Sequence, residues 1–403
     1  MAVIRPFRAV RPDTDAAPHV AAVPYDVVDV EEARALAGGN PLSFLHVSRA
    51  EIDLPPGTDP HGDIVYRTAA ERYRALKRDA PLIEEAEPTV YLYHLSAEGH
   101  GQTGVAACYS LADYDSNVIK KHERTRQDKE DDRTRHIVEL RAQTGPVFLA
   151  HRPLAQIDEL ARRVRATDAP VADFTALDGV RHSIWRVGSR MVPAFVDAFA
   201  EVDSLYIADG HHRAASGARA RAALRDSDES HFLLAVAFPS DQLRILPYNR
   251  VVRDLNGMTP QHFLGEVART FAMKSGLPAP AEKGEVSMYV DGAWHMVDLE
   301  SAGVASGGVL DGLDGNVLQE RLLKPILGIQ DVRTDGRIDF VGGARGTQTL
   351  EQLVDSGRMA VAFSMYPVSL VELMEVSDAG DIMPPKSTWF EPKLRDGLLI
   401  HEI

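Results

Sequence analysis

Short apolar runs alternate along this chain with Ala- and Arg-rich amphipathic segments, a pattern typical of a mixed α/β protein. Runs rich in β-branched and aromatic residues predict strands at 89–95, 104–111, 182–187, 205–208, 231–238, 243–252, 285–290 and 293–299. Helical periodicity predicts helices at 69–78, 156–166, 214–223, 318–324 and 369–376. Gly99–Gly101 and Asp291–Gly292 predict hairpins, and the charged stretch from 117 to 135 predicts an irregular region.

The 403 residues exceed what one hydrophobic core normally holds. We expect an N-terminal lobe at 1–88, a core at 89–256 and a C-terminal lobe at 257–403. No apolar run approaches the roughly 18 to 20 residues of a membrane span, and the N-terminus lacks signal-peptide features. We therefore expect a cytoplasmic protein without a membrane partner. The one cysteine, Cys108, lies in an apolar run and is expected to be buried.

The chain is acidic, with 59 acids against 44 bases and a net charge of −15. A protein that follows a nucleic-acid backbone normally presents a basic face. Basic residues do gather between 120 and 135, but acids interleave with them. This mixture favours a small anionic ligand over nucleic acid.

The sequence Asp209-Gly-His-His-Arg213 joins a predicted strand to a predicted helix. Gly210 would let the backbone approach a ligand closely, and the start of the helix would attract an anion. Arg213 could hold a phosphate through two hydrogen bonds, while Asp209 could hold a metal ion or a substrate hydroxyl. The alternative is a turn with a capping acid and two surface histidines.

A second candidate site is His122-Glu-Arg-Thr-Arg126. The second histidine of a zinc-protease HExxH motif is missing at position 126, which argues against that chemistry. Glu123, beside a histidine, a hydroxyl and several cations, could act as a general base for an alcohol. The alternative is a solvated run of charges. A Walker A motif does not occur, and the GxGxxG sequence at Gly99–Gly104 lies in the predicted hairpin between two strands and does not join a strand to a helix.

Five motifs in order resemble the bacterial proteins grouped as domain of unknown function 1015. They are Val23-Pro-Tyr-Asp26, His122–Thr125 with Asp132-Arg133, Asp209–Arg213, Leu246-Pro-Tyr-Asn-Arg250 and Met383–Thr388. Around Asp209–Arg213 that family is similar to free-serine kinases and to the ParB/sulfiredoxin superfamily. Two departures are Asn249, where relatives carry histidine, and the 86 residues between positions 123 and 209.

The resemblance implies a ParB/sulfiredoxin-like nucleotide-binding core with additional N- and C-terminal lobes. It implies a kinase that phosphorylates the hydroxyl of free L-serine or a similar hydroxy-amino acid, with ATP or ADP as donor and Mg²⁺ as cofactor. The partners are then the nucleotide and the amino acid, and a homodimer is left open. Sulfinic-acid reduction is excluded, since His211 stands at the position of the sulfiredoxin cysteine.

The resemblance also implies residue roles. Glu123 would accept the hydroxyl proton, with Asp209 and His211 completing the catalytic group and Asp209 binding Mg²⁺. Nucleotide phosphates would meet Gly210, His212, Arg213, Thr125 and Arg126. Substrate or donor contacts would come from His122, Lys129, Arg133, Lys386, Ser387 and Thr388.

Two other functions fit the same motifs. One is a ParB-like nucleotide clamp, in which hydrolysis resets a conformational switch. The other is a metal-dependent phosphohydrolase with Asp209, His211 and His212 as ligands. The clamp predicts slow turnover that serine does not stimulate, and the hydrolase predicts phosphate release without an acceptor.

Overall fold

A computed structural model describes residues 1–303, 308–384 and 386–403. These residues form two compact units. The first unit comprises Met1–Leu243 and Pro392–Ile403, and the second comprises Arg244–Glu391. This division differs from the three predicted segments. Residues 1–88 share the first unit with most of the predicted core, and residues 392–403 return to it after the second unit.

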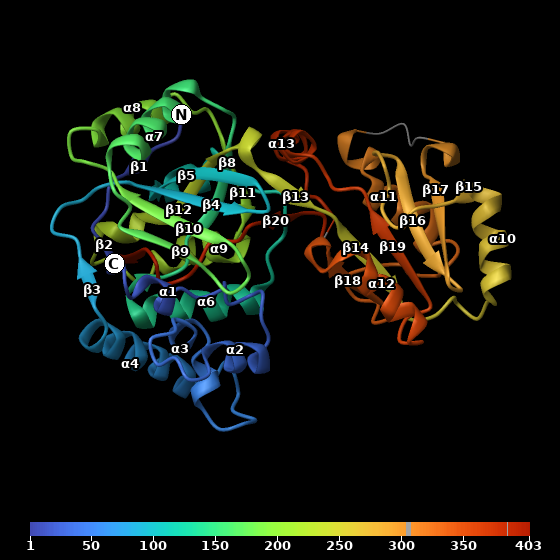
Figure 1. Cartoon of the computed structure of the whole chain (residues 1–403), viewed down its shortest axis with the longest axis horizontal. Helices are drawn as coiled ribbons and strands as arrows, with labels where there is room; N and C mark the ends of the chain where they lie inside the picture. The colour runs from blue at the N-terminus through green and yellow to red at the C-terminus, as the bar shows by residue number, and fades with distance from the viewer. Residues whose placement is uncertain (304–307, 385) are drawn as a thin grey trace. The chain divides into compact units, whose positions relative to one another are not determined.

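A nine-stranded mixed sheet is the centre of the first unit (Figure 1). Its order is β6 (Ile119–Lys120), β11 (Leu205–Asp209), β8 (Val147–His151), β12 (Phe232–Pro239), β5 (His100–Ser110), β4 (Tyr91–Ala97), β10 (Arg181–Arg186) and β9 (Ala172–Thr175), with β1 (Ile4–Arg5) also paired to β5. The predicted β4–β5 hairpin is confirmed, and Cys108 on β5 is buried as expected.

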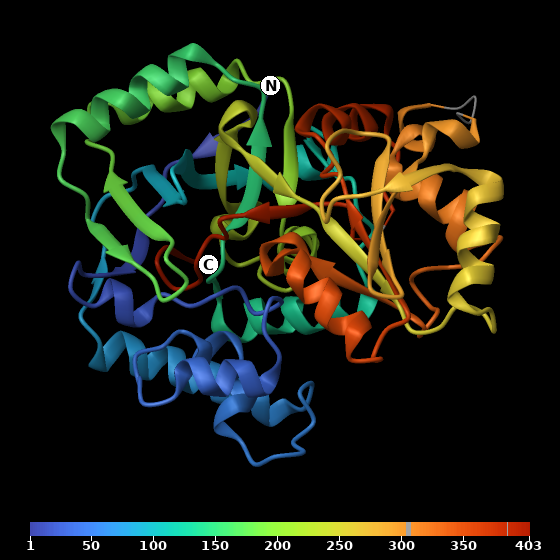
Figure 2. The ribbon, with the colours of Figure 1, turned by 45° about the vertical axis from the view of Figure 1, so that its right-hand side comes forward.

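Helices lie on both sides of this sheet (Figures 1 and 2). On one side are α7 (Ala155–Thr167) and α8 (Val192–Ala200). Ile157, Ala161 and Val164 of α7 are buried, which is the spacing of one helix face. On the other side α6 (Gln127–Leu140) packs beside α9 (His211–Ala220). The predicted irregular region from 117 to 135 was thus wrong: it contains β6 and much of α6.

Most of the N-terminal helices lie below α6 in Figure 1. They are α2 (Val30–Ala37), α3 (Leu45–Ser48) and α4 (Asp63–Asp79), while α1 (Ala17–Val20) contacts β9 and β2, and α5 (Leu111–Asp115) follows β5. The arrangement is also visible in Figure 2. A small sheet closes this region, in the order β3 (Leu82–Glu84), β2 (Ala9–Pro12), β21 (Ile400–Glu402) and β7 (Ala142–Gln143). Because β21 pairs with β2 and β7, the C-terminal segment is built into the first unit.

The second unit is built on a six-stranded antiparallel sheet. Its order is β15 (Ala272–Ser275), β17 (Ala293–Asp298), β16 (Glu285–Val290), β19 (Val361–Met365), β14 (Tyr248–Val252) and β18 (Ile338–Gly342). The strand predicted at 243–252 is two strands, because β13 (Arg244–Leu246) pairs with β20 (Trp389–Glu391) before β14 begins. The helices are α10 (Pro260–Thr270), α11 (Asp314–Leu318), α12 (Gly346–Asp355) and α13 (Leu370–Ala379).

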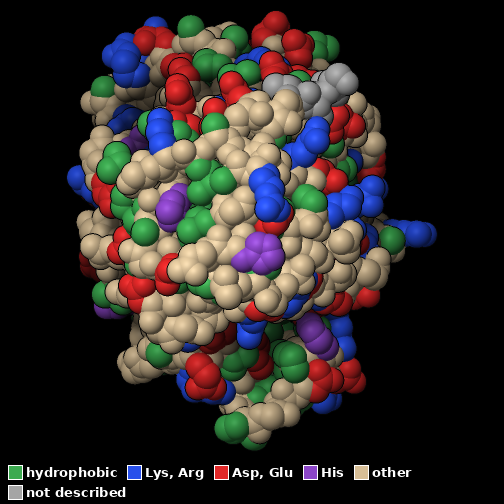
Figure 3. All heavy atoms as spheres, turned by 90° about the vertical axis from the view of Figure 1, so that its right-hand side faces the viewer, with side chains coloured by type: hydrophobic (Ala, Val, Ile, Leu, Met, Phe, Trp, Pro, Cys, Tyr) green, Lys and Arg blue, Asp and Glu red, His purple; other side chains and the backbone are tan. Residues whose placement is uncertain are grey.

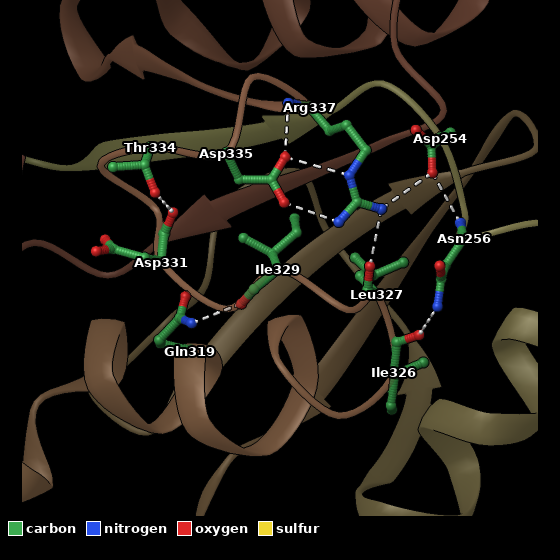
Figure 4. Close-up of polar contacts among 10 residues, drawn as sticks. All are labelled: Asp254, Asn256, Gln319, Ile326, Leu327, Ile329, Asp331, Thr334, Asp335 and Arg337. Atoms are coloured by element: carbon green, nitrogen blue, oxygen red, sulfur yellow. Dashed lines mark hydrogen bonds and ion pairs between the residues drawn. The ribbon is translucent and has the colours of Figure 1, made fainter.

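One arginine organises the turn-rich stretch that precedes β18 (Figure 4). Arg337 donates from Nη2 to Asp335 at 2.8 Å and from Nη1 to the carbonyl of Leu327 at 3.1 Å. Its Nη1 also lies 3.4 Å from Asp254, which follows β14. A single planar guanidinium therefore connects three segments of the second unit.

Charged side chains of both signs are interspersed over the face of the second unit drawn in Figure 3. That face does not carry the continuous basic stripe typical of nucleic-acid binding. Within the part of the chain that the structure describes, no helix is both long and apolar enough to cross a membrane.

Candidate functional site

The turn after β11 consists of a glycine directly before the start of α9. Gly210 has φ 94° and ψ 32°, in the left-handed region that favours glycine. A Cβ built there would lie 3.0 Å from Cζ and Nε of Arg213. Helix α9 begins at His211, and the first backbone N–H groups of a helix have no partner within it. Position 210 therefore favours glycine, and the start of helix α9 follows it directly.

Arg213 is held by protein groups on two sides. Its Nη1 donates to the carbonyl of Pro146 at 2.6 Å, and its Nη2 lies 2.5 Å from Asp209. Burial opposes its charge, but the carboxylates of Asp26, Asp209 and Asp396 outweigh burial and raise the guanidinium pKa. Both terminal nitrogens of Arg213 are thus occupied, one by the carbonyl directly before β8 and the other by the last residue of β11. A two-point contact with a phosphate through these two nitrogens would have to replace both partners.

Asp209 lies between two cations. Lys393 Nζ is 2.6 Å from one carboxylate oxygen, and Arg213 is paired with the other. Burial alone would raise the carboxyl pKa, but Lys393 and Arg213 outweigh it and lower the pKa well below its usual value. Asp209 is therefore ionised at neutral pH, and it brings the ammonium group of Lys393 to the start of α9.

The two histidines of the turn fasten the segment 122–126. His211 Nε2 accepts a hydrogen bond from the backbone N–H of His122 at 3.4 Å, and the two rings lie edge to face with centroids 4.5 Å apart. His212 Nε2 accepts from the backbone N–H of Arg126 at 3.0 Å. Burial lowers the pKa of all three imidazoles, that of His122 to about 4, so they are neutral at pH 7.

Glu123 lies in a bend between these two attachments and is half-buried. Strand β6 pairs in parallel with β11, Ile119 facing Leu205, so the chain leaves β6 at the same sheet edge as Asp209. The structure thus brings together the two motifs that the sequence singled out. Whether the Glu123 carboxylate acts as a base stays a prediction.

The neighbouring residues have local partners. Thr125 donates its hydroxyl hydrogen bond to Glu130 at the start of α6. Arg126 is exposed and forms a fork with Asp128, at 2.8 and 3.1 Å. Lys129 lies half-buried in the first turn of α6. These three residues flank the turn, and only the backbone of Arg126 is attached to it.

Arg133, predicted to meet a substrate or donor group, is part of a buried network. Its Nη2 lies 2.7 Å from Asp132, and its guanidinium lies 4.2 Å from the centroid of the Tyr25 ring. Its Nη1 donates to the carbonyl of Ser48 at 3.2 Å. Asp132 also accepts from the hydroxyl of Tyr66 at 2.7 Å. Arg133 therefore attaches α6 to the N-terminal helices.

The remaining predicted residues belong to the second unit. Lys386 Nζ lies 5.4 Å from the ring centroid of Tyr248, and Ser387 donates to the carbonyl of Pro384 at 2.7 Å. Thr388 precedes β20, while Pro385 lies outside the described residues. Asn249 is buried and accepts from the backbone N–H of Met365 at 3.0 Å, so it supports the sheet.

Sequence reasoning missed three acids and bases at this site. Asp26, from the Val-Pro-Tyr-Asp motif, and Asp396 both act on the charge of Arg213, and Lys393 binds Asp209. The motif was the available signal for Asp26. Lys393 and Asp396 lie outside the five motifs, and their place depends on the return of the C-terminal segment to the first unit.

A comparison with curated proteins found no match. A free serine kinase in complex with AMP is 15% identical, with 69% of this chain and 89% of that chain covered and a TM-score of 0.36. SbnI with a C-terminal truncation from Staphylococcus aureus is 13% identical, with 71% and 84% covered and a TM-score of 0.39. A conserved hypothetical protein from Pyrococcus furiosus is 14% identical, with 71% and 92% covered and a TM-score of 0.36.

Structural similarities with TM-scores this low do not support a conclusion about the activity of this protein. The family described as Protein of unknown function (DUF1015), in contrast, matches residues 4–316, which is more than half of the chain. That match spans four of the five motifs, from Val23-Pro-Tyr-Asp26 to Leu246–Arg250. The chain therefore belongs to the DUF1015 family.

Proposed function

We propose that the protein is a small-molecule kinase that transfers a phosphoryl group from a nucleotide to the hydroxyl of free L-serine or a similar hydroxy-amino acid. The observation that carries this proposal is the attachment of the Glu123 segment to the turn by His211 and His212. A carboxylate that can accept the hydroxyl proton and a turn that can hold phosphates are two of the parts that phosphoryl transfer to an alcohol uses. The proposal includes the prediction that the core is a ParB/sulfiredoxin-like nucleotide-binding domain.

In the proposed reaction Glu123 accepts the proton of the substrate hydroxyl. The hydroxyl oxygen forms a bond to the terminal phosphorus of the donor, and the bond from that phosphorus to the bridging oxygen breaks. The products are the phosphomonoester and the nucleotide shortened by one phosphate. The first backbone N–H groups of α9 and the Lys393 ammonium group, held by Asp209, would neutralise charge on the phosphates.

Mg²⁺ is the usual companion of nucleotide phosphates and would shield their charge. At the turn, Asp209 offers the carboxylate oxygens suited to it, and both are paired with cations. Asp209 would bind the ion only if the ion displaced Lys393 or Arg213 from its carboxylate. Proton transfer and substrate positioning are therefore assigned to protein side chains and backbone groups alone.

The metal-dependent hydrolase is less favoured by the geometry. The Nε2 atoms of His211 and His212 accept hydrogen bonds from backbone amides, so metal binding through them would break both attachments. Among the described residues, no group of three or more His, Cys, Asp or Glu side chains is placed to hold a metal ion. The nucleotide clamp remains the alternative that the assay must separate from a kinase.

The test is a nucleotide-consumption assay on the full chain with Mg²⁺ and ATP, ADP or CTP, each with and without L-serine. Products are identified by ³¹P NMR and mass spectrometry. We expect nucleotide consumption to require the amino acid and to form a phosphomonoester in equal amount. Equal consumption with and without L-serine, with inorganic phosphate as the only product, would overturn the proposal and leave the clamp or the hydrolase.

A further inference from the structure

A small polar cavity lies beside Arg213 within the first unit. Its volume is about 40 Å³, enough for about three water molecules or one small polar group. Its lining includes Tyr25, Ser48, Arg133, His136, Arg213 and Asp396. Because Arg213 also binds Asp209, the cavity adjoins the proposed phosphate site.

Three residues that line the cavity each have a buried polar atom without a hydrogen-bond partner. These atoms are Ser48 Oγ, Arg213 Nε and Asp396 Oδ1, in residues that are 3%, 8% and 3% exposed. Buried polar atoms are nearly always hydrogen-bonded, because leaving one unpaired costs about 1–3 kcal/mol. Three such atoms around one cavity indicate that a polar partner belongs there.

The backbone holds the Asp396 carboxylate in place. The N–H of Asp396 donates to the carbonyl of Ala22 at 2.9 Å, and the N–H of Ala22 donates back at 3.2 Å. A Cβ at Gly145 would lie 2.3 Å from Asp396 Oδ1, so glycine makes room for the carboxylate. Burial raises the pKa of Asp396 to about 7, although Arg213 opposes the shift. Such a carboxylate would gain from meeting a cation.

The other charged groups of the cavity already have partners. Arg133 is paired with Asp132. His136 faces the carbonyl of Val47 at 3.0 Å, and burial lowers its pKa to about 4, so it is neutral. Three groups therefore remain for a ligand: the carboxylate oxygen of Asp396, the cationic N–H of Arg213 Nε and the hydroxyl of Ser48. These groups complement a molecule that carries both an ammonium and a carboxylate group.

We propose that this cavity binds the zwitterionic head group of an α-amino acid, with Asp396 facing its ammonium group and Arg213 Nε and Ser48 Oγ facing its carboxylate. That this amino acid is the phosphoryl acceptor rests on the proposed function. Asp396 is then a specificity-determining residue. Alcohols that lack the ammonium group, such as D-glycerate, or the carboxylate, such as ethanolamine, would be poor ligands.

The experiment measures binding of L-serine, D-glycerate and ethanolamine to the full chain by calorimetry at pH 8, with and without AMP. The variants are Asp396→Asn, Ser48→Ala and, as a matched control, Asp226→Asn, an exposed acid of the same unit paired with Arg141. We expect the unaltered protein to prefer L-serine. Asp396→Asn should weaken L-serine binding about tenfold or more and remove the preference over D-glycerate, while Asp226→Asn leaves both unchanged.

Equal binding of L-serine to Asp396→Asn and to the unaltered protein would overturn the inference, and so would failure of L-serine to bind at all. Circular dichroism checks folding, and if Asp396→Asn does not fold, a loss of L-serine affinity in Ser48→Ala decides in its place. The two proposals fail separately. Serine binding that depends on Asp396 without phosphoryl transfer removes only the kinase, and serine phosphorylation that does not depend on Asp396 removes only the head-group site.

Discussion

The Nε2 atom of His212 accepts a hydrogen bond from the backbone N–H of Arg126, 3.0 Å away across 86 residues of sequence. Together with the contact between His211 and His122, it holds both ends of the segment that carries Glu123. His211 and His212 therefore fix the position of residues 122–126 relative to the turn. This gives the two imidazoles that follow Gly210 a structural role.

Replacing His212 by alanine should loosen this segment. The lost hydrogen bond is worth about 0.5–1.5 kcal/mol, so amide hydrogen exchange of residues 122–126 should accelerate several-fold while turnover falls. His212→Gln is the matched control, because its side-chain oxygen can still accept the hydrogen bond and should restore part of the protection. Unchanged exchange in His212→Ala would show that the contact does not hold the segment.

Gly210→Ala should destabilise the first unit and weaken nucleotide binding. A non-glycine residue in the left-handed region costs about 1–2 kcal/mol, and the new Cβ would also press on the Arg213 guanidinium, 3.0 Å away. Gly188→Ala is the control, since an added Cβ there meets no atom within 4 Å. Urea denaturation of both variants measures the difference, and equal stabilities would contradict the strain argument.

Glu123→Gln should keep nucleotide affinity and lower turnover by about 10² to 10⁴, the usual contribution of a general base. Glutamine keeps the size of the side chain and its capacity for hydrogen bonds but loses its basicity. Glu139→Gln, an exposed position on α6, is the control. Steady-state kinetics and calorimetric titration with the donor provide the two readouts. Nearly full activity in Glu123→Gln would mean that the segment is structural.

Binding of L-serine should strengthen as the pH rises from about 6 to 8. Asp396, whose pKa burial raises to about 7, must be ionised to meet an ammonium group. The charged groups that act on it are Arg213, Arg133, Arg395 and Asp26. Binding at pH 6 should therefore release a proton, which calorimetry in buffers of different ionisation enthalpy detects. Asp396→Asn should show neither effect.

The same pKa has a consequence for stability. The folded protein keeps the Asp396 proton at pH values where the unfolded chain, with a pKa near 3.8, has lost it. The contribution of this group to the free energy of unfolding therefore decreases as the pH rises from about 4 to 7, by a few kcal/mol at most. Urea denaturation of Asp396→Asn across this range should lack that decrease.

Much of the site could be predicted from local sequence. The strand at 205–209, the glycine turn and the helix that follows are encoded by adjacent residues, because an apolar run, a glycine and an Ala-rich stretch each favour one backbone conformation. The hairpin β4–β5 was found for the same reason. Helix α6 was missed, because its buried face includes Asp132 and His136, which bind Tyr66 and the carbonyl of Val47 instead of forming an apolar stripe.

By itself the sequence determined where the two motifs lie, at 122–126 and at 209–213, since the residue types and turn signals of each lie within a few positions. Only the tertiary structure decided what each segment meets. Pairing of β6 with β11 set Glu123 beside the turn, and pairing of β21 with β2 and β7 returned Lys393 and Asp396 to the first unit after the second unit was complete. Such contacts depend on pairing between strands that lie 86 or more residues apart, which leaves no periodicity in the sequence between them.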